Sequence, residues 1–260
     1  EAHQTEIDEF AVFPTGYLGL VTPRNSLELY DGDIRLTGRD GKELEKFDPQ
    51  DYLDYIAEHV ESWSYLKFPY YKKLGYPEGV YRVGPLGRLN NSDQIDTPLA
   101  NEEFKHFKAL NGGKPVENTL HYHYARLIET LFAAEHARIL LEDPDILSSD
   151  ILNTRQQPQE QGVGIIEAPR GTLFHHYWSN GSGQLTKVNL IVGTGNNNYA
   201  MSRAVDEVAK RYVHGPDITE GMLNRVEHAI RAHDPCLSCS TPAVGSMPLG
   251  VSAFTKRGEL

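Results

Sequence analysis

Apolar and polar positions alternate in the first fifth of the chain and then follow a helical period over much of the rest. Residues 27–44 alternate around two Asp-Gly turn signals, which predicts a small β meander after a strand within residues 9–21. Asp48 is a suitable N-cap and Pro49 suits the first helical position, so a helix is predicted over residues 47–63. The segment 64–91 is rich in Pro, Gly and aromatic residues and predicts an ordered loop.

Residues 101–232 predict further helices on both sides of a segment of three strands. Residues 118–143 run without Gly or Pro and predict a long central helix, whose core stripe is expected at Leu127, Leu131, Ala134 and Ile139. On the same helix, Glu129 is expected to form a structural ion pair with Arg126 rather than to act as a proton relay. Three strands are predicted within residues 162–193. Shorter helices are expected at residues 101–110, 199–213 and 218–232.

These elements predict a helix-rich α+β fold, in which long central helices accompany small antiparallel β-sheets. Neither a repeat nor a clear linker divides the sequence, so a single domain over residues 1–260 is expected. Asp and Glu number 36 against 25 Lys and Arg, and no basic run predicts binding to nucleic acid. The apolar runs fall short of the roughly 18 residues that a membrane span requires, so we expect a cytoplasmic protein without a membrane span.

The two cysteines, Cys236 and Cys239, lie at CxxC spacing near one end of the sequence. Thiols three residues apart can bind one metal ion, and metal binding would deprotonate both. A thioredoxin-like redox pair is disfavoured because the pair follows a helix and a proline instead of opening a helix. Spacing alone leaves two interpretations open, half of a metal site and two buried thiols without a special role.

The residues around the cysteines extend this motif. The stretch "RAHDPCLSCSTPAVGSMPL" resembles the carboxy-terminal signature of nickel–iron hydrogenase large subunits. Further similar blocks occur in the order of that family: "AVFPTGYLGLV", "SYLKFPYYKKLGYPEGVYRVGPLGRLN", "HYHYARLIETLFAAE" and "EAPRGTLFHHY". The resemblance covers nearly the whole chain and is strongest to the soluble branch that exchanges electrons with a nicotinamide or deazaflavin partner. A hydrogenase large-subunit-like fold is therefore expected.

This resemblance implies roles for six residues. In the family, four cysteines from two CxxC motifs hold nickel and an iron that carries cyanide and carbon monoxide, so Cys236 would be a terminal nickel ligand and Cys239 would bridge both metals. Thiolates are soft ligands that suit this centre, and a terminal thiolate can accept a proton when dihydrogen is split. Arg170 would polarise the open metal position. The remaining implied residues are Ala168 and Pro169 beside the diatomic ligands, and Thr194 as a hydroxyl donor to cyanide.

Neighbouring polar residues have simpler interpretations. Asp234 is equally suited to hydrogen-bond the backbone of the CxxC turn and to satisfy amides at the end of a helix. His175, His176 and His233 are interpreted as packing residues with satisfied hydrogen bonds rather than ligands. For Arg170, the alternative to a catalytic role is an ordinary loop salt bridge, which the surrounding EAPRG motif disfavours.

Two departures from the family pattern bear on function. The amino-terminal CxxC is absent, so the chain is expected to be the carboxy-terminal portion of a large subunit. The family's CxxCxxH motif has Pro242 in place of histidine, and proline has no side-chain ligand atom. This puts in question a magnesium site near the carboxy terminus and the family's proteolytic cleavage. Residues 243–260 are accordingly interpreted as an extension that has not been removed.

The leading hypothesis is an enzyme subunit that oxidises dihydrogen reversibly to protons and electrons. It would require the missing amino-terminal half and a small subunit with iron–sulfur clusters, and diaphorase-type subunits are expected as electron-transfer partners. One alternative is a catalytically silent hydrogenase-like scaffold in an electron-transfer complex. Another is a small zinc-binding module that uses the CxxC.

Overall fold

A computed structural model describes residues 4–152, 159–215, 217–240, 254–255 and 258–259. Within these residues, no helix is both long and apolar enough to cross a membrane. The helices are α1 (Gln4–Glu9), α2 (Tyr52–Tyr55), α3 (Gly84–Asn91), α4 (Pro98–Ala109), α5 (His121–Glu142), α6 (Gly193–Asn196), α7 (Asn198–Tyr212) and α8 (Glu220–Ala232), with 3₁₀ turns η1 (Pro49–Asp51) and η2 (Pro144–Leu147). The strands are β1 (Gly16–Val21), β2 (Asp33–Thr37), β3 (Glu43–Phe47), β4 (Ile56–His59), β5 (Phe68–Tyr71), β6 (Tyr81–Arg82), β7 (Gln161–Ala168), β8 (Gly171–Ser179), β9 (Leu185–Ile191), β10 (Phe254–Thr255) and β11 (Gly258–Glu259).

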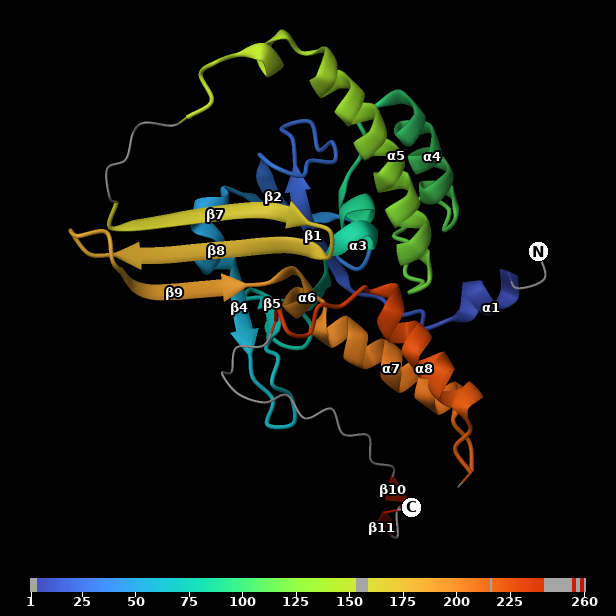
Figure 1. The fold of residues 1–260 in the computed structure, drawn as a ribbon. Helices are drawn as coiled ribbons and strands as arrows, with labels where there is room; N and C mark the ends of the chain where they lie inside the picture. The colour runs from blue at the N-terminus through green and yellow to red at the C-terminus, as the bar shows by residue number, and fades with distance from the viewer. Residues whose placement is uncertain (1–3, 153–158, 216, 241–253, 256–257, 260) are drawn as a thin grey trace.

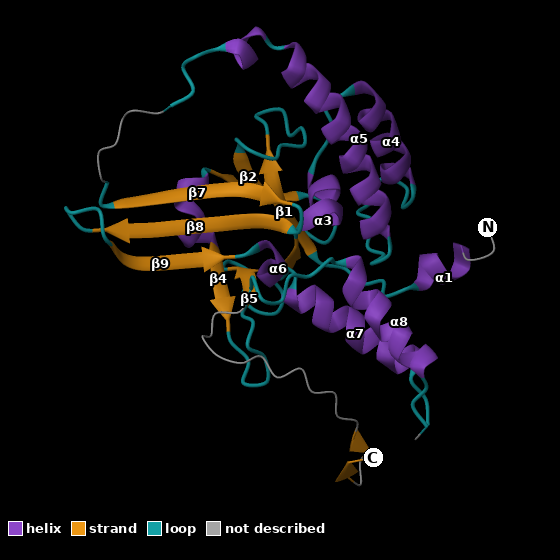
Figure 2. Ribbon diagram, in the orientation of Figure 1, coloured by secondary structure: helices purple, strands orange, loops and turns teal. Residues whose placement is uncertain are grey.

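The strands form small sheets rather than one continuous sheet (Figure 2). One has the order β3-β2-β1-β6, in which β6 runs parallel to β1 and the other pairs are antiparallel. The long antiparallel sheet β7-β8-β9 carries the EAPRG motif at the end of β7. Sequence analysis predicted these three strands and the β meander, but it did not predict the parallel pair.

Three clusters of buried apolar residues hold the elements together. In the first, α3, α4 and α5 pack with Leu27 and Ile95. In the second, the inner face of β1 and β2 packs against Phe174 of β8 and Ile191 of β9. The third joins the start of the chain to α7 and α8. All eight residues of α3 are buried, because this helix lies between β1 and α5 (Figure 1).

The helix predicted over residues 47–63 ends after a single turn. Asp48 caps η1, accepting a hydrogen bond from the backbone N–H of Gln50, as the sequence indicated. After α2, however, the chain becomes strand β4 and pairs with β5 from Ile56 opposite Tyr71 to His59 opposite Phe68. Cross-strand contacts with the aromatic residues of β5 thus override the helical signal of the local sequence.

The segment 64–91 is more regular than the predicted loop. It contains β5, β6 and the helix α3. Gly84 lies at a positive φ of 79° and Pro85 follows at the start of α3. The glycine provides a backbone conformation that other residues rarely adopt, and proline suits a first helical turn. The Gly and Pro residues that suggested a loop therefore mark where this helix begins.

Helices α4, α5, α7 and α8 lie where the sequence predicted them, but α5 has a different buried face. Its buried residues are Tyr122, Ala125, Ile128 and Phe132. Of the predicted core stripe, Leu127 is 68% exposed, Ile139 is 50% exposed and Ala134 is also exposed, while Leu131 is half-buried. The predicted stripe was therefore wrong by about one residue around the helix, and it leaves apolar side chains at the surface.

Candidate metal centre

Three segments far apart in the sequence meet at the candidate site. These are the turn between β7 and β8, the short helix α6, and the loop that follows α8 (Figure 1). They carry Arg170, Thr194 and the cysteine pair, respectively. Of the six residues predicted from the resemblance, Thr194 hydrogen-bonds to Cys236, and Arg170 hydrogen-bonds to Asp234, two residues before Cys236.

Arg170 is tied to the cysteine loop through Asp234. Its Nε donates a hydrogen bond of 2.6 Å to the backbone oxygen of Asp234 and lies 3.5 Å from the carboxylate Oδ2. Both side chains are partly exposed, at 38% and 49%. Neither of the two interpretations offered for Asp234 included this ion pair, because the sequence gives no sign that residues 64 positions apart are in contact. The guanidinium therefore contacts a residue only two positions from Cys236.

Thr194 of α6 holds the cysteine loop at Cys236. Its side-chain oxygen accepts a hydrogen bond of 3.1 Å from the backbone N–H of Cys236, and the residue is buried. A hydroxyl that accepts this bond retains its own hydrogen for a second partner. The geometry is compatible with the donor role implied by the resemblance, which remains a prediction.

The two cysteine sulfurs are joined in a disulfide, Cys236 to Cys239. Cys236 is half-buried and Cys239 is exposed. Binding of a metal ion by these sulfurs would require reduction of the disulfide, because thiolates are the ligands that metals bind. Ala168 is half-buried at the end of β7, and Pro169 is exposed in the turn that leads to Arg170.

The donor set fits part of a nickel–iron centre. Two soft sulfur atoms from one short loop suit nickel and iron, and a fixed cation lies nearby at Arg170. Among the described residues, no group of three or more His, Cys, Asp and Glu side chains is placed to hold a metal ion. The described residues therefore offer two sulfur atoms that could bind a metal ion once reduced, and no complete metal site. Two expectations concern residues that lie almost wholly outside the described part of the chain. They are the loss of a cation ligand at Pro242 and the uncleaved extension 243–260.

Each of the three histidines predicted to pack has a polar contact at one ring nitrogen, but Nε2 of His176 and of His233 is buried without a hydrogen-bond partner among the described residues, so the expected satisfied hydrogen bonds are incomplete. His233 is fully buried, and its Nδ1 lies 3.0 Å from the backbone oxygen of Ala229. Burial lowers the pKa of His233 to about 3, so the ring is neutral at physiological pH. His176 contacts the Tyr52 hydroxyl and His175 contacts the Tyr177 hydroxyl.

The turn that carries Arg170 is packed tightly on both sides. A Cβ placed on Gly171 would lie 2.1 Å from Cγ2 of Val83, and Gly171 has a φ of 136°. A Cβ on Gly84 would lie 2.9 Å from the backbone oxygen of Arg170. Asn197 donates to the same oxygen, at 3.3 Å. Close backbone contacts therefore fix the direction in which the turn leaves β7.

Comparison with known proteins agrees with the arrangement of these residues. A family model described as nickel-dependent hydrogenase matches residues 21–242. The chain belongs to the nickel-dependent hydrogenase family. This confirms the family that the sequence motifs indicated.

Two curated relatives illustrate how much of each matched protein the chain covers. The chain is 46% identical over 264 residues to the beta subunit of the NAD-reducing hydrogenase HoxS of Cupriavidus necator, covering 100% of this chain and 54% of that protein. It is 46% identical over 222 residues to one of the subunits of the F420-non-reducing hydrogenase of Methanothermobacter thermautotrophicus, covering 84% of this chain and 46% of that protein. The chain therefore spans about half the length of these relatives.

Solved structures show the same relation. The crystal structure of an NAD⁺-reducing [NiFe]-hydrogenase in the H2-reduced state superposes with a TM-score of 0.87 at 45% identity, covering 92% of this chain and 53% of that one. A [NiFeSe]-hydrogenase of Dm. baculatum superposes with a TM-score of 0.61 at 20% identity, covering 92% of this chain and 54% of that one, which supports the fold alone. The fold of this hydrogenase-family chain thus corresponds to about half of each of these chains, which confirms the helix-rich fold that the sequence predicted.

Proposed function

We propose that this chain is one half of the catalytic large subunit of a nickel–iron hydrogenase. The completed enzyme would oxidise dihydrogen reversibly to two protons and two electrons. The observation that carries the proposal is the convergence of Arg170, Thr194 and the cysteine pair at one junction, in a chain of the nickel-dependent hydrogenase family. Cys236, Cys239, Arg170 and Thr194 would act there, with Ala168 and Pro169 lining the same side.

Once reduced, Cys236 and Cys239 would hold the metals, and the nickel–iron centre would supply the site at which dihydrogen is cleaved. Arg170 would bring a fixed positive charge to that site, because its guanidinium is already oriented by Asp234. Thr194 would fix the backbone of Cys236 and direct its own hydroxyl hydrogen to an anionic acceptor such as cyanide on iron. The thiolate of Cys236 would accept a proton released from dihydrogen.

The completed large subunit would require further partners. The other half would contribute the missing CxxC, and an iron–sulfur small subunit would carry the electrons away. The similarity to subunits of an NAD-reducing hydrogenase and of an F420-non-reducing hydrogenase supports an electron-transfer complex, in which diaphorase-type subunits would pass electrons to the final acceptor.

Apolar side chains at the surface indicate where the other half would dock. The outer face of β7-β8-β9 exposes Ile166, Val188 and Leu190. The end of α5 and the segment that follows it arc over this sheet, as Figure 1 shows, and also expose apolar residues. We define the docking surface by these two groups, the second being Leu140, Leu141, Ile146, Leu147, Ile151 and Leu152. Exposed apolar side chains gathered in this way are typical of an interface.

The first prediction concerns metal content. The 260-residue chain, purified alone and reduced, should bind no stable nickel–iron centre and show no hydrogen uptake, because two thiolates leave the metals under-coordinated. Coexpression with the unmatched half of the Cupriavidus necator relative, its iron–sulfur partner and its maturation proteins should give nickel and iron by mass spectrometry, together with hydrogen-dependent dye reduction. The same coexpression with a Cys236→Ser, Cys239→Ser variant is the control.

Each metal result has a distinct meaning. Stoichiometric nickel and dye reduction in the chain alone would show that other residues supply the missing ligands, which contradicts the half-subunit proposal. Zinc alone, lost in the cysteine variant, would support the zinc-binding module. A metal-free complex that assembles normally would support the silent scaffold.

The second prediction concerns the docking surface. The chain alone should self-associate, because several large aliphatic side chains at the end of α5 face solvent. The double variant Leu147→Ser, Ile151→Ser should shift sedimentation towards the monomer and reduce binding of a hydrophobic dye. Leu99→Ser is a matched control, since Leu99 is an exposed leucine on α4 outside this surface. A monodisperse wild-type monomer with low dye binding would contradict the prediction.

A further inference from the structure

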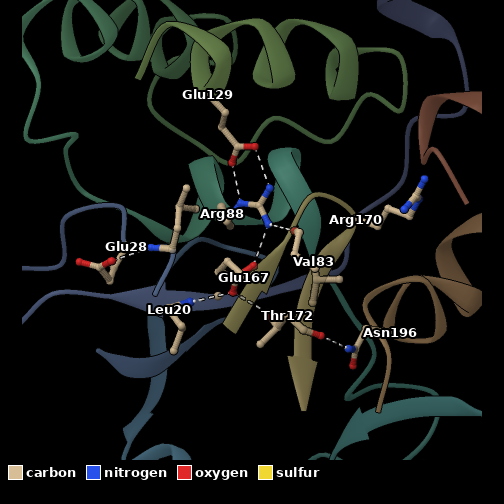
Figure 3. A network of polar contacts seen from close by, with 12 residues as sticks. Leu20, Glu28, Val83, Arg88, Glu129, Glu167, Arg170, Thr172 and Asn196 are labelled. Atoms are coloured by element: carbon tan, nitrogen blue, oxygen red, sulfur yellow. Dashed lines mark hydrogen bonds and ion pairs between the residues drawn. The ribbon is translucent and has the colours of Figure 1, made fainter. Parts of the chain in front are cut away.

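A cluster of three charged residues lies in the interior, next to the turn that carries Arg170 (Figure 3). Arg88 of α3 is only 2% exposed. Its Nε and Nη2 donate to the two carboxylate oxygens of Glu129 on α5, at 2.6 and 2.7 Å. Its Nη1 donates to Glu167 at 2.7 Å and to the backbone oxygen of Ala168 at 2.9 Å, both at the end of β7. One guanidinium therefore connects two helices to the strand that leads to Arg170.

Glu167 extends the cluster to two more strands. Its second oxygen accepts hydrogen bonds from the backbone N–H of Leu20 on β1, at 3.0 Å, and from the hydroxyl of Thr172 on β8, at 2.7 Å. Thr172 in turn accepts a bond from Asn196 of α6 through its backbone oxygen, at 2.9 Å. The strand positions immediately before and after the Arg170 turn are thus held by side chains from separate elements.

Burying the charged groups of this cluster costs solvation free energy, which a purely structural role does not explain well. It places two carboxylates against one guanidinium, and burial raises the pKa of Glu167. Well-packed apolar residues often stabilise a protein as much as a buried ion pair does, so such a pair is weak evidence for stability alone. Its specific property is geometric, because a bidentate guanidinium has directional contacts that a packed apolar side chain lacks.

The sequence predicted an ion pair between Glu129 and Arg126, one helical turn away, and that prediction was wrong. Arg126 instead contacts His123 and the backbone oxygen of Ala232. Glu129 points inward to Arg88, which the sequence did not single out. The glutamate of the EAPRG motif was a possible signal, since a carboxylate on a buried strand needs a cationic partner.

We propose that Arg88 is a positioning residue that acts on Arg170 through the backbone. By holding the oxygen of Ala168, two residues before Arg170, it fixes the end of β7 and keeps the Arg170 guanidinium against Asp234 beside the cysteine pair. The placement of Arg170 is a property of this chain, whereas its consequence for hydrogen turnover rests on the proposed function.

The test measures how accessible Arg170 is to an arginine-specific reagent. Phenylglyoxal modification of each arginine in the reduced 260-residue chain is followed by peptide mass spectrometry, with the exposed Arg138 as the internal standard. In Arg88→Lys, the rate at Arg170 relative to Arg138 should rise by about fivefold, because lysine cannot form the bidentate contacts and the Arg170–Asp234 contact loosens. Glu129→Leu, which leaves Arg88 held from one side only, should give a smaller increase.

Arg35→Lys is the matched control. Arg35 is also a buried arginine between two carboxylates, those of Glu43 and Asp93, and it also donates to a backbone oxygen, that of Asn91. These contacts do not involve the Arg170 turn. The control should lower stability without changing the relative rate at Arg170, so a general loosening of the fold is separated from positioning.

Three results would overturn the proposal. The first is an unchanged relative rate at Arg170 in a folded Arg88→Lys variant. The second is an equal increase in Arg35→Lys. The third, should Arg88→Lys fail to fold, is an unchanged rate in Glu129→Leu. Because the rate requires neither nickel nor hydrogenase activity, failure of the proposed function would leave this test intact. In an active complex, Arg88→Lys should additionally lower turnover per nickel.

Discussion

Replacement of Arg170 with lysine is expected to lower hydrogen turnover per bound nickel by on the order of 100-fold, with metal content nearly unchanged. Lysine retains the positive charge but loses the planar guanidinium that Asp234 orients. The metal ligands are not altered, so loading should continue. Nickel by mass spectrometry and dye reduction under hydrogen, both measured on the complex completed by the other half, give the required ratio.

A purely structural Arg170 predicts the opposite pattern. If its contact with Asp234 serves only to hold the cysteine loop, Arg170→Lys should reduce yield or nickel content while turnover per loaded nickel stays normal. Arg24→Lys is a suitable control, because Arg24 also pairs with an aspartate, Asp96, but lies on an exposed loop. Equal turnover per nickel in wild type and Arg170→Lys would remove Arg170 from the proposed catalytic residues.

The Gly171→Ala variant is expected to lose about 3 kcal/mol or more of its free energy of unfolding. The added Cβ would meet Val83 at 2.1 Å, and the φ of 136° is one that alanine rarely adopts. Neither side of the turn can easily yield, since Gly84 and Gly193 approach it through backbone atoms. Urea denaturation followed by circular dichroism measures the loss.

Gly164→Ala provides a control within the same hairpin. A Cβ at Gly164 would meet no atom within 4 Å, and its backbone has no positive φ. Its free energy of unfolding should change by less than about 1 kcal/mol, because glycine in the middle of a strand is only slightly less favourable than alanine. Equal stability of Gly171→Ala and Gly164→Ala would show that the turn can move away from α3, contrary to its close packing against Val83 and Gly84.

Local sequence predicted the elements whose stability is local. The sequences of α4, α5, α7 and α8 place apolar residues at a helical period. The sequences of β7, β8 and β9 are typical of strands, and a clear turn signal separates β8 from β9. Strand β4 was missed because its pairing with β5 depends on residues about ten or more positions away. A segment with both helical and strand signals adopts the secondary structure that its neighbours in space stabilise, even where its own propensity differs.

The sequence motifs predicted which residues belong to the candidate site, but they did not predict the contacts between those residues. The EAPRG and DPCxxC motifs identified Arg170 and the cysteines, yet the Arg170–Asp234 contact joins residues 64 positions apart. The same limit applies to Arg88, which lies 41 residues from Glu129 and 79 from Glu167. One sequence does not show which partner a buried charge selects, as the mistaken pairing of Glu129 with Arg126 illustrates.

The wide sequence separation of these contacts also bears on the order in which the molecule folds. The bond from Leu20 to Glu167 closes a loop of 147 residues, whereas α4 and α5 pack as near neighbours along the chain. Loop-closure entropy delays contacts of high separation, so the helical pair should form early and the Arg88 cluster late. Local opening would then affect the cysteine loop while α4 and α5 remain intact. Metal insertion would accordingly take place in a chain whose helical part is already rigid.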